Sequence, residues 1–211
     1  MADFYIETGN KKLAPVLLLH STGGDEFQLL PIARQLFENH PLIAIRGRIS
    51  EQGINRYFKL KGPAFTKENF DLASLAEESD WLISKINQLL NEYELDGSQL
   101  IALGYSNGAN VALNMQQKGL VSFDKIIAFH AMQLEDLVPI SMPNPPKIWL
   151  SHADNDSIVS KDNFDALTEN LSLSGCQLEI YKSQAGHQLT ASEIAAVQAW
   201  MASQPEKKET L

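Results

Sequence analysis

Residues 100–117, LIALGYSNGANVALNMQQ, decide the fold of this chain. An apolar strand leads into the turn Gly-Tyr-Ser-Asn-Gly at residues 104–108, and a helical stretch follows. This order is typical of a nucleophile elbow, in which a serine lies in a strained turn before a helix N-terminus. Gly104 and Gly108 suit it because a Cβ atom there would collide with the neighbouring strand and helix. Ser106 is therefore the candidate nucleophile, with a plain strand-to-helix turn as the alternative.

The rest of the chain repeats this alternation of strands and helices. Short aliphatic runs predict strands at residues 4–7, 15–20, 42–46, 99–105, 125–130, 147–152 and 177–182. Segments of helical period predict helices at residues 25–38, 68–93, 107–118, 161–171 and 190–201. The inner runs VLLLH, LIAIR, LIALGY and KIIAFH are almost continuously apolar, as in strands buried on both faces. The sequence thus predicts an α/β protein with a mostly parallel sheet of about seven strands flanked by helices.

The chain is expected to form a single domain over residues 1–211. Its 211 residues can build a core without disulfides, and the single cysteine, Cys176, has no partner for an internal one. No repeat, low-complexity tract or linker divides the sequence, and the charged end, residues 205–211, is expected to be frayed. Residues 47–66 lack a clear period, and a loop of this length is usually functional or else misassigned.

Composition narrows the choice of partners. The formal net charge of −9 disfavours nucleic acid, because an acidic chain repels a phosphate backbone. No apolar run approaches the roughly 20 residues that span a bilayer, and no secretory signal is visible. We therefore expect a cytoplasmic monomer or homodimer that acts on a small molecule.

A serine nucleophile needs a histidine base, and the base needs an acid to orient it. Asp154 and Asp156 follow the predicted strand at residues 147–152, and His187 follows the strand at residues 177–182. The order Ser, Asp, His, with each residue on a loop beyond a strand end, is that of α/β-hydrolases. Ser106, one of the two aspartates and His187 form the candidate triad.

An oxyanion hole would complete the site. The residue after the nucleophile supplies one backbone N–H, here Asn107, and a loop after an early strand supplies the other. That loop is HSTGG, residues 20–24, with Thr22 as the candidate donor. It lacks the Gly-x-Gly-x-x-Gly spacing and the lysine of nucleotide-binding loops. Since no HExxH or paired-cysteine motif is present either, we expect no metal and no cofactor.

Three of the four arginines, Arg46, Arg48 and Arg56, fall within eleven residues. A guanidinium group presents donors suited to a carboxylate or phosphate. Arg48 and Arg56 are therefore candidates for binding an acidic or strongly polar acyl substrate, with Tyr57 and Phe58 as an apolar wall. The alternative is that the arginines pair with nearby carboxylates and fix the long loop.

The remaining histidines are expected to have other roles. His130 and Met132 end the strand KIIAFH, at the edge where open α/β sheets bind ligands, so they either line the pocket or belong to the core or rim. His20 and His152 end buried strands and are expected to hold the site loops by hydrogen bonds.

The segments HSTGG, GYSNGAN, HADNDSIV (residues 152–159) and GHQLT (residues 186–190) resemble those of a known group. They are similar to the small α/β-hydrolases grouped as carboxylesterases, phospholipases and acyl-protein thioesterases, especially a short bacterial branch associated with quinone or metal stress. The similarity covers roughly residues 14–201. It implies the α/β-hydrolase fold without a large lid, and a link to stress response.

The resemblance also assigns the acid. In the family, the acid is the second aspartate of the segment that corresponds to HADNDSIV. The resemblance therefore implies that Asp156 is the acid and that Asp154 shapes the loop. Two positions depart from the family pattern, because Ser21 stands where glycine is usual and Ser157 where proline is frequent. Related dienelactone hydrolases carry cysteine as the nucleophile, so Ser106 argues against dienelactone chemistry.

The sequence therefore predicts a serine hydrolase that cleaves carboxylic esters of small soluble substrates, anionic ones included, through an acyl-enzyme. Activity should rise with pH through the range where histidine titrates, about 6 to 7, because the base must be neutral. One alternative is an acyl-protein thioesterase or lysophospholipase, which would need an apolar acyl channel. Another is a ligand-binding protein that keeps the hydrolase fold without catalysis.

Overall fold

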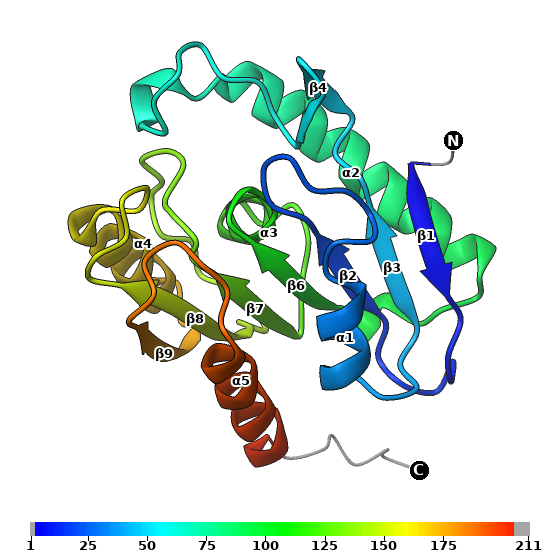
Figure 1. Cartoon of the computed structure of the whole chain (residues 1–211). Coiled ribbons are helices and arrows are strands. Elements are labelled where there is room, and N and C mark those ends of the chain that lie inside the picture. Colours follow the sequence, from blue (N-terminus) through cyan, green and yellow to red (C-terminus); the bar gives the residue numbers. More distant parts are fainter. Residues whose placement is uncertain (1–2, 205–211) are drawn as a thin grey trace.

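The computed structural model describes residues 3–204 and contains one large sheet (Figure 1). Its strand order is β1-β3-β2-β6-β7-β8-β9. The strands are β1 (Phe4–Glu7), β2 (Val16–Leu19), β3 (Leu42–Ile45), β6 (Ile101–Tyr105), β7 (Lys125–Phe129), β8 (Lys147–Ala153) and β9 (Gln177–Ser183). β1 runs antiparallel to β3, and all the other neighbours are parallel.

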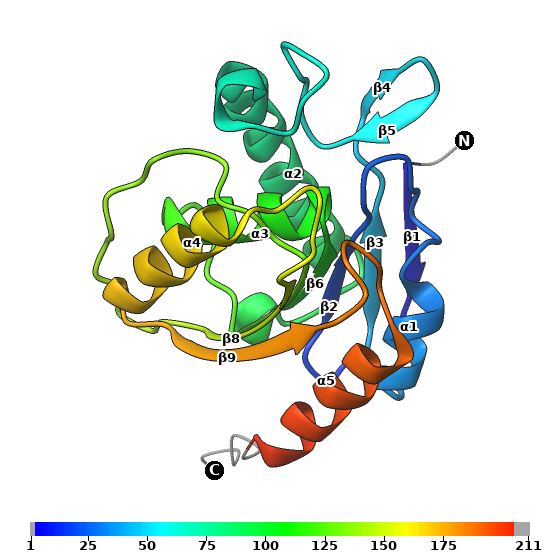
Figure 2. The same ribbon diagram turned by 60° about the vertical axis from the view of Figure 1, so that its left-hand side comes forward.

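Helices cover both faces of this sheet (Figure 2). α2 (Leu72–Glu92), α3 (Asn107–Gln117) and α4 (Lys161–Leu173) pack on one face, and α1 (Leu30–Leu36) and α5 (Ala191–Ser203) pack on the other. Successive strand residues point to opposite faces of the sheet. Leu17 and Leu19 therefore belong to the core on the side of α2, α3 and α4, and Val16 and Leu18 belong to the core on the side of α1 and α5. Two apolar layers explain why the inner strands read as continuous apolar runs.

The predicted α/β fold is confirmed, and all seven predicted strands are present. The first helix is shorter than the predicted residues 25–38, since α1 spans only Leu30–Leu36. The proline that follows Leu30 lies in the first helical turn, where its missing N–H costs no hydrogen bond. Short 3₁₀ turns at Lys67–Asn69 and Gly97–Gln99 precede α2 and β6. The predicted fraying of residues 205–211 lies outside the described residues.

Residues 47–66 contain a hairpin that was not predicted from the sequence. β4 (Ile49–Glu51) pairs with β5 (Ile54–Arg56), and Gln52 and Gly53 form its two-residue turn with φ of 53° and 80°. Positive φ at both turn positions matches the right-handed twist of paired strands. No large lid is inserted among residues 3–204, and no helix there is long and apolar enough to cross a membrane.

Gly108 allows α3 to approach the end of β2 closely. A Cβ atom at Gly108 would lie 2.2 Å from the Leu19 carbonyl oxygen. Gly108→Ala should therefore push α3 from the sheet and lower the free energy of unfolding by about 3 kcal/mol, measured by urea denaturation. Gly53→Ala at the hairpin tip is the control, since it adds only backbone strain of about 1 kcal/mol. Equal losses in the two variants would contradict this account.

Candidate active site

Ser106 lies in a strained turn between β6 and α3. Its φ of 50° and ψ of −112° are values that a residue with a side chain rarely adopts. Two backbone hydrogen bonds hold the turn, from the Ser106 N–H to the Phe129 carbonyl and from the Asn110 N–H to the Ser106 carbonyl, each of 2.8 Å. The structure thus has the predicted elbow, with the candidate nucleophile at the carboxyl edge of the sheet.

The other two candidate triad residues meet Ser106 at this edge. His187 Nε2 lies 2.8 Å from Ser106 Oγ, and His187 Nδ1 lies 2.8 Å from Asp156 Oδ2. Asp156 Oδ1 accepts hydrogen bonds from the backbone N–H groups of Ile158 and Val159, at 2.8 and 2.9 Å. Asp154 is exposed, so the acid in contact with His187 is Asp156.

The surroundings keep Asp156 ionised. Burial alone would raise the pKa of Asp156, but hydrogen bonds from His130, His187 and two backbone N–H groups lower it well below its usual range. With Asp156 charged, His187 donates through Nδ1 and leaves Nε2 free to accept the proton of Ser106. This is the arrangement that general-base activation of an alcohol requires.

Both predicted oxyanion donors border the pocket at Ser106. Thr22 and Asn107 line it, and Asn107 is the first residue of α3, where a backbone N–H has no partner within the helix. In the loop after β2, the N–H groups of Ser21 and Gly23 donate to Gln28 Oε1 and to the Asn55 carbonyl. Thr22 is therefore the candidate donor of this loop. Ser21, the departure from the family pattern, also fixes the loop through its bonds with Gln28.

Buried hydrogen bonds tie residues 47–66 to the site. His20 Nε2 accepts from the Gly47 N–H at 2.9 Å, and its Nδ1 lies 2.6 Å from the Ser21 carbonyl. Burial lowers the pKa of His20, which favours this neutral form. Tyr57 donates its hydroxyl proton to Ile45 and accepts from the His20 N–H, while its own N–H donates to Asn107 Oδ1. His20 holds the loops as expected, but the expectation for His152 is wrong: neither of its ring nitrogens makes a hydrogen bond within residues 3–204, and the ring stacks on Phe164 with centroids 4.5 Å apart.

The predicted substrate-binding residues separate into two groups. Arg56, Phe58 and Met132 line the pocket at Ser106. Tyr57 does not line it, because its ring is buried against His20. Arg48 does not line it either.

The partners of Arg48 explain its position. Arg48 Nε lies 2.6 Å from Glu78 Oε2, and its guanidinium group lies 5.0 Å from the Trp81 ring centroid. This is the loop-fixing role considered as the alternative, and Arg46 likewise pairs with Asp3 and Glu26.

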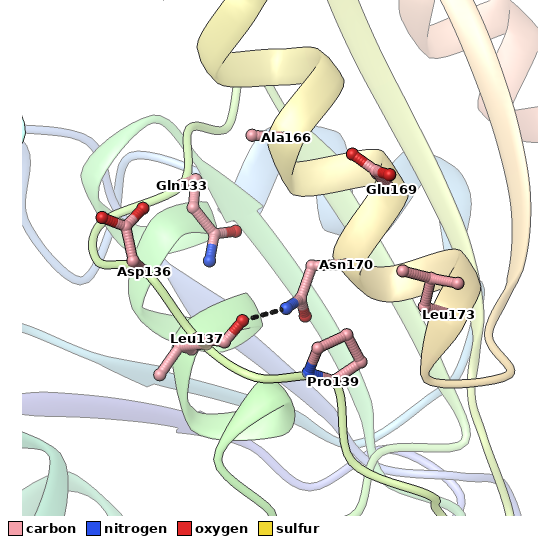
Figure 3. Close-up of a pocket in the computed structure, with 8 residues that line it drawn as sticks. All are labelled: Gln133, Asp136, Leu137, Pro139, Ala166, Glu169, Asn170 and Leu173. Atoms are coloured by element: carbon pink, nitrogen blue, oxygen red, sulfur yellow. Dashed lines mark hydrogen bonds between the residues drawn. The ribbon is translucent and has the colours of Figure 1, made fainter.

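The pocket over Ser106 is narrow and mostly apolar. Its lining consists of Thr22, Arg56, Phe58, Leu60, Phe65, Phe70, Ser106, Asn107, Asn110, Met132 and Ile158. A hollow of ≈ 370 Å³ adjoins it and shares Phe65, Met132 and Ile158. Figure 3 shows a different hollow, beside α4, where Asn170 donates to the Leu137 carbonyl and no candidate triad residue contributes to the lining.

His130 contacts the candidate acid and does not line the pocket at Ser106. Its Nδ1 lies 3.3 Å from Asp156 Oδ2, and its Nε2 lies 2.9 Å from Oε1 of Glu193, a residue that the sequence analysis did not select. The only signal for Glu193 was its place three residues after Thr190, which predicts a capping box. Among the described residues, His130, Asp156 and His187 are also the one group whose nitrogen and oxygen atoms lie close enough together to hold a metal ion. The hydrogen bonds of both histidines to Asp156 explain why these atoms lie so close together.

Residues 63–207 match the model of the dienelactone hydrolase family. The chain belongs to this family. It is 55% identical to YahD, whose structure with malic acid superposes with a TM-score of 0.91, and the match covers 96% of this chain and 98% of YahD. It is 25% identical to the Bacillus cereus carboxylesterase, with a TM-score of 0.84 and coverage of 94% and 92%.

A curated relative from Bacillus subtilis (strain 168), MhqD, is named as a hydrolase. It is 27% identical over 191 residues, which cover 88% of this chain and 90% of MhqD. Together these similarities identify an esterase-type hydrolase.

Three buried histidines give stability a defined pH dependence. Burial lowers the pKa of His20 and His152, whereas Asp156 and Glu193 overcome the effect of burial and raise the pKa of His130 to about 9. A histidine with a lowered pKa stabilises the fold above about pH 6.5 and loses this effect in acid. The raised pKa of His130 stabilises the fold fully below about pH 6.5, and this stabilisation is lost as the pH rises through about 9.

The contribution of His130 to the free energy of unfolding should therefore fall by about 2 kcal/mol between pH 6.5 and 8.5, because the unfolded chain releases this proton first, whereas His20 and His152 each oppose the fall by at most about 0.4 kcal/mol. Urea denaturation at pH 6.5, 7.5 and 8.5 measures this. His130→Asn should abolish the decline, and an undiminished decline in that variant would refute the assignment to His130.

Proposed function

We propose that the protein is a serine carboxylesterase that hydrolyses esters of small anionic acyl compounds through an acyl-enzyme. The observation that carries this proposal is the hydrogen-bonded series from Ser106 through His187 to Asp156, at a pocket that also contains Arg56. Family membership supports the hydrolase class, and a serine at the elbow suits an ester substrate.

The proposed reaction begins with proton transfer. His187 Nε2 takes the proton of Ser106 while Oγ attacks the ester carbonyl, and Asp156 stabilises the resulting imidazolium. The N–H groups of Thr22 and Asn107 bind the oxyanion, and such a donor contributes roughly 3 kcal/mol. His187 then protonates the leaving alcohol and afterwards activates the water that releases the acid.

Arg56 supports an anionic substrate. Its side chain is 12% exposed, its Nε lies 3.4 Å from Glu51, and this Nε makes no hydrogen bond to any residue of the described part of the chain. A mostly buried guanidinium group whose Nε–H makes no hydrogen bond gains from a carboxylate. YahD, the 55% identical relative, was solved with malic acid, a small dicarboxylic acid of this kind.

The narrow pocket supports a short acyl group. Phe58, Phe70 and Met132 close around Ser106, whereas an acyl-protein thioesterase or lysophospholipase needs a long apolar channel. A series of p-nitrophenyl esters separates these functions. Activity should be highest for two to four carbons, and a maximum at eight or more carbons would favour the thioesterase or lysophospholipase.

Ser106→Ala should lower kcat roughly 1,000-fold or more, because it removes the oxygen that forms the proposed acyl-enzyme. Labelling with a fluorophosphonate probe should be lost in parallel, as seen on a gel. Ser157→Ala, which changes an exposed serine beside the acid, is the control and should keep both. Persistent labelling of the Ser106→Ala protein would contradict the proposal, and absence of labelling in the wild type would favour a non-catalytic binding protein.

Arg56→Gln should raise KM for a monoester of a dicarboxylic acid about 10- to 100-fold, the usual loss for a charge-assisted hydrogen bond. KM for a neutral ester of equal length should change less than threefold. Arg48→Gln is the control, since Arg48 pairs with Glu78 away from the pocket. An unchanged preference in Arg56→Gln, or an equal change in Arg48→Gln, would rule out this role.

A further inference from the structure

Two ionisable side chains, His130 and Glu193, lie buried next to Asp156, the acid of the candidate triad. The side chains of His130, Asp156 and Glu193 are all 0% exposed. His130 lies between the two carboxylates, with Nδ1 3.3 Å from Asp156 Oδ2 and Nε2 2.9 Å from Glu193 Oε1. The Gln188 carbonyl lies 3.2 Å from the same Nε2.

This placement determines the protonation of His130. A neutral imidazole has one N–H and one lone pair, so one of its nitrogens would point a lone pair at an acceptor oxygen. The protonated ring donates from both nitrogens, and its positive charge offsets two carboxylates that burial would otherwise disfavour. The pKa of His130, raised to about 9, agrees with this conclusion.

Glu193 is itself fixed from the other side. Its Oε2 accepts from the Thr190 N–H at 2.8 Å and from the Thr190 hydroxyl at 2.7 Å, in the capping box that starts α5. Burial would raise the pKa of Glu193, but the neighbouring His130 ring and the hydrogen bonds from Thr190 lower it, so this carboxylate is charged. The backbone of His130 has a φ of 51°, an uncommon conformation that the surrounding contacts must hold.

We propose that His130 and Glu193 form a positioning pair for the triad: Glu193 anchors His130, and His130 orients Asp156 and offsets part of its charge. This inference rests on the triad proposed above. Asp156 Oδ2 is shared, since the Nδ1 atoms of both His187 and His130 face it. His130 thus competes with His187 for the same oxygen.

The expected consequence is a change in the working pH of the base. The His130 and His187 ring centroids lie 5.2 Å apart, so a positive charge on His130 disfavours a second one on His187. Replacing His130 by a neutral residue removes this repulsion, so the acidic limb of the activity profile should move to higher pH.

Within residues 3–204, the other titratable groups that face His130 are Tyr105 on β6, at 6.1 Å between ring centroids, and His152 on β8. Burial raises the pKa of Tyr105 and lowers that of His152, so both are neutral. The charges that act on His130 are therefore those of Asp156 and Glu193, with His187 acquiring its charge during the reaction.

His130→Asn tests the pair, because asparagine can keep a neutral donor near Asp156 while the charge is lost. The acidic limb of the kcat/KM profile should move up by about one pH unit, with roughly a tenfold loss at pH 6 and less than a threefold loss at pH 8.5. KM should stay within twofold. His40→Asn, at a histidine that contacts the Ala14 carbonyl far from the triad, is the control and should keep the wild-type profile.

Removing His130 alone leaves the buried charge of Glu193 without its partner, which could destabilise the fold. A double variant that removes both charges separates this effect from the effect on the triad. His130→Asn combined with Glu193→Gln removes both charges and keeps an acceptor for Thr190. Its acidic limb should move in the same direction, by about half a pH unit. An unchanged limb in both variants, or an equal loss of rate at every pH, would overturn the proposal.

A second measurement does not depend on activity. Nitrogen-15 NMR of the wild-type imidazole rings at pH 7.5 should show both ring protons on His130, and a neutral His130 at this pH would overturn the proposal. If the wild type shows no hydrolysis that depends on Ser106, the proposed function fails, and the NMR result still decides the charge of His130.

Discussion

The carboxylate of Asp156 is the contact on which the site depends. One of its oxygens is held by two N–H groups of its own loop after β8, and the other faces His187 from the loop after β9 and His130 from the end of β7. Through His187 it also reaches Ser106 at the end of β6. One buried charge therefore joins the carboxyl ends of four neighbouring parallel strands, which explains why the acid must stay ionised.

The fold could be predicted because each inner strand is apolar on both faces. Such runs are easy to recognise, and the elbow at Ser106 with the later Asp156 and His187 follows the chain order of the hydrolase fold. Resemblance was needed to choose between Asp154 and Asp156, since residue type and position after the strand are the same for both. The structure separates them by exposure and by the contact with His187.

What the sequence could not predict depends on contacts between distant residues. Arg48 and Arg56 look equivalent in the sequence, but Arg48 pairs with Glu78 on α2, away from the pocket, whereas Arg56 lines the pocket and also pairs with Glu51. The pairing of His130 with Glu193 joins residues from β7 and α5 in the same way. The hairpin was missed for a local reason, because strands of three residues are too short to show a period.

The capping box of α5 has a consequence for the order in which the enzyme is assembled. Thr190 and Glu193 start the helix that follows all other described elements, and Glu193 also holds the histidine behind the acid. A nascent chain on the ribosome would carry the complete elbow yet lack this support until α5 had emerged and folded. The proposed base would thus reach its wild-type working pH only after residues 187–193 had been made and packed against the sheet.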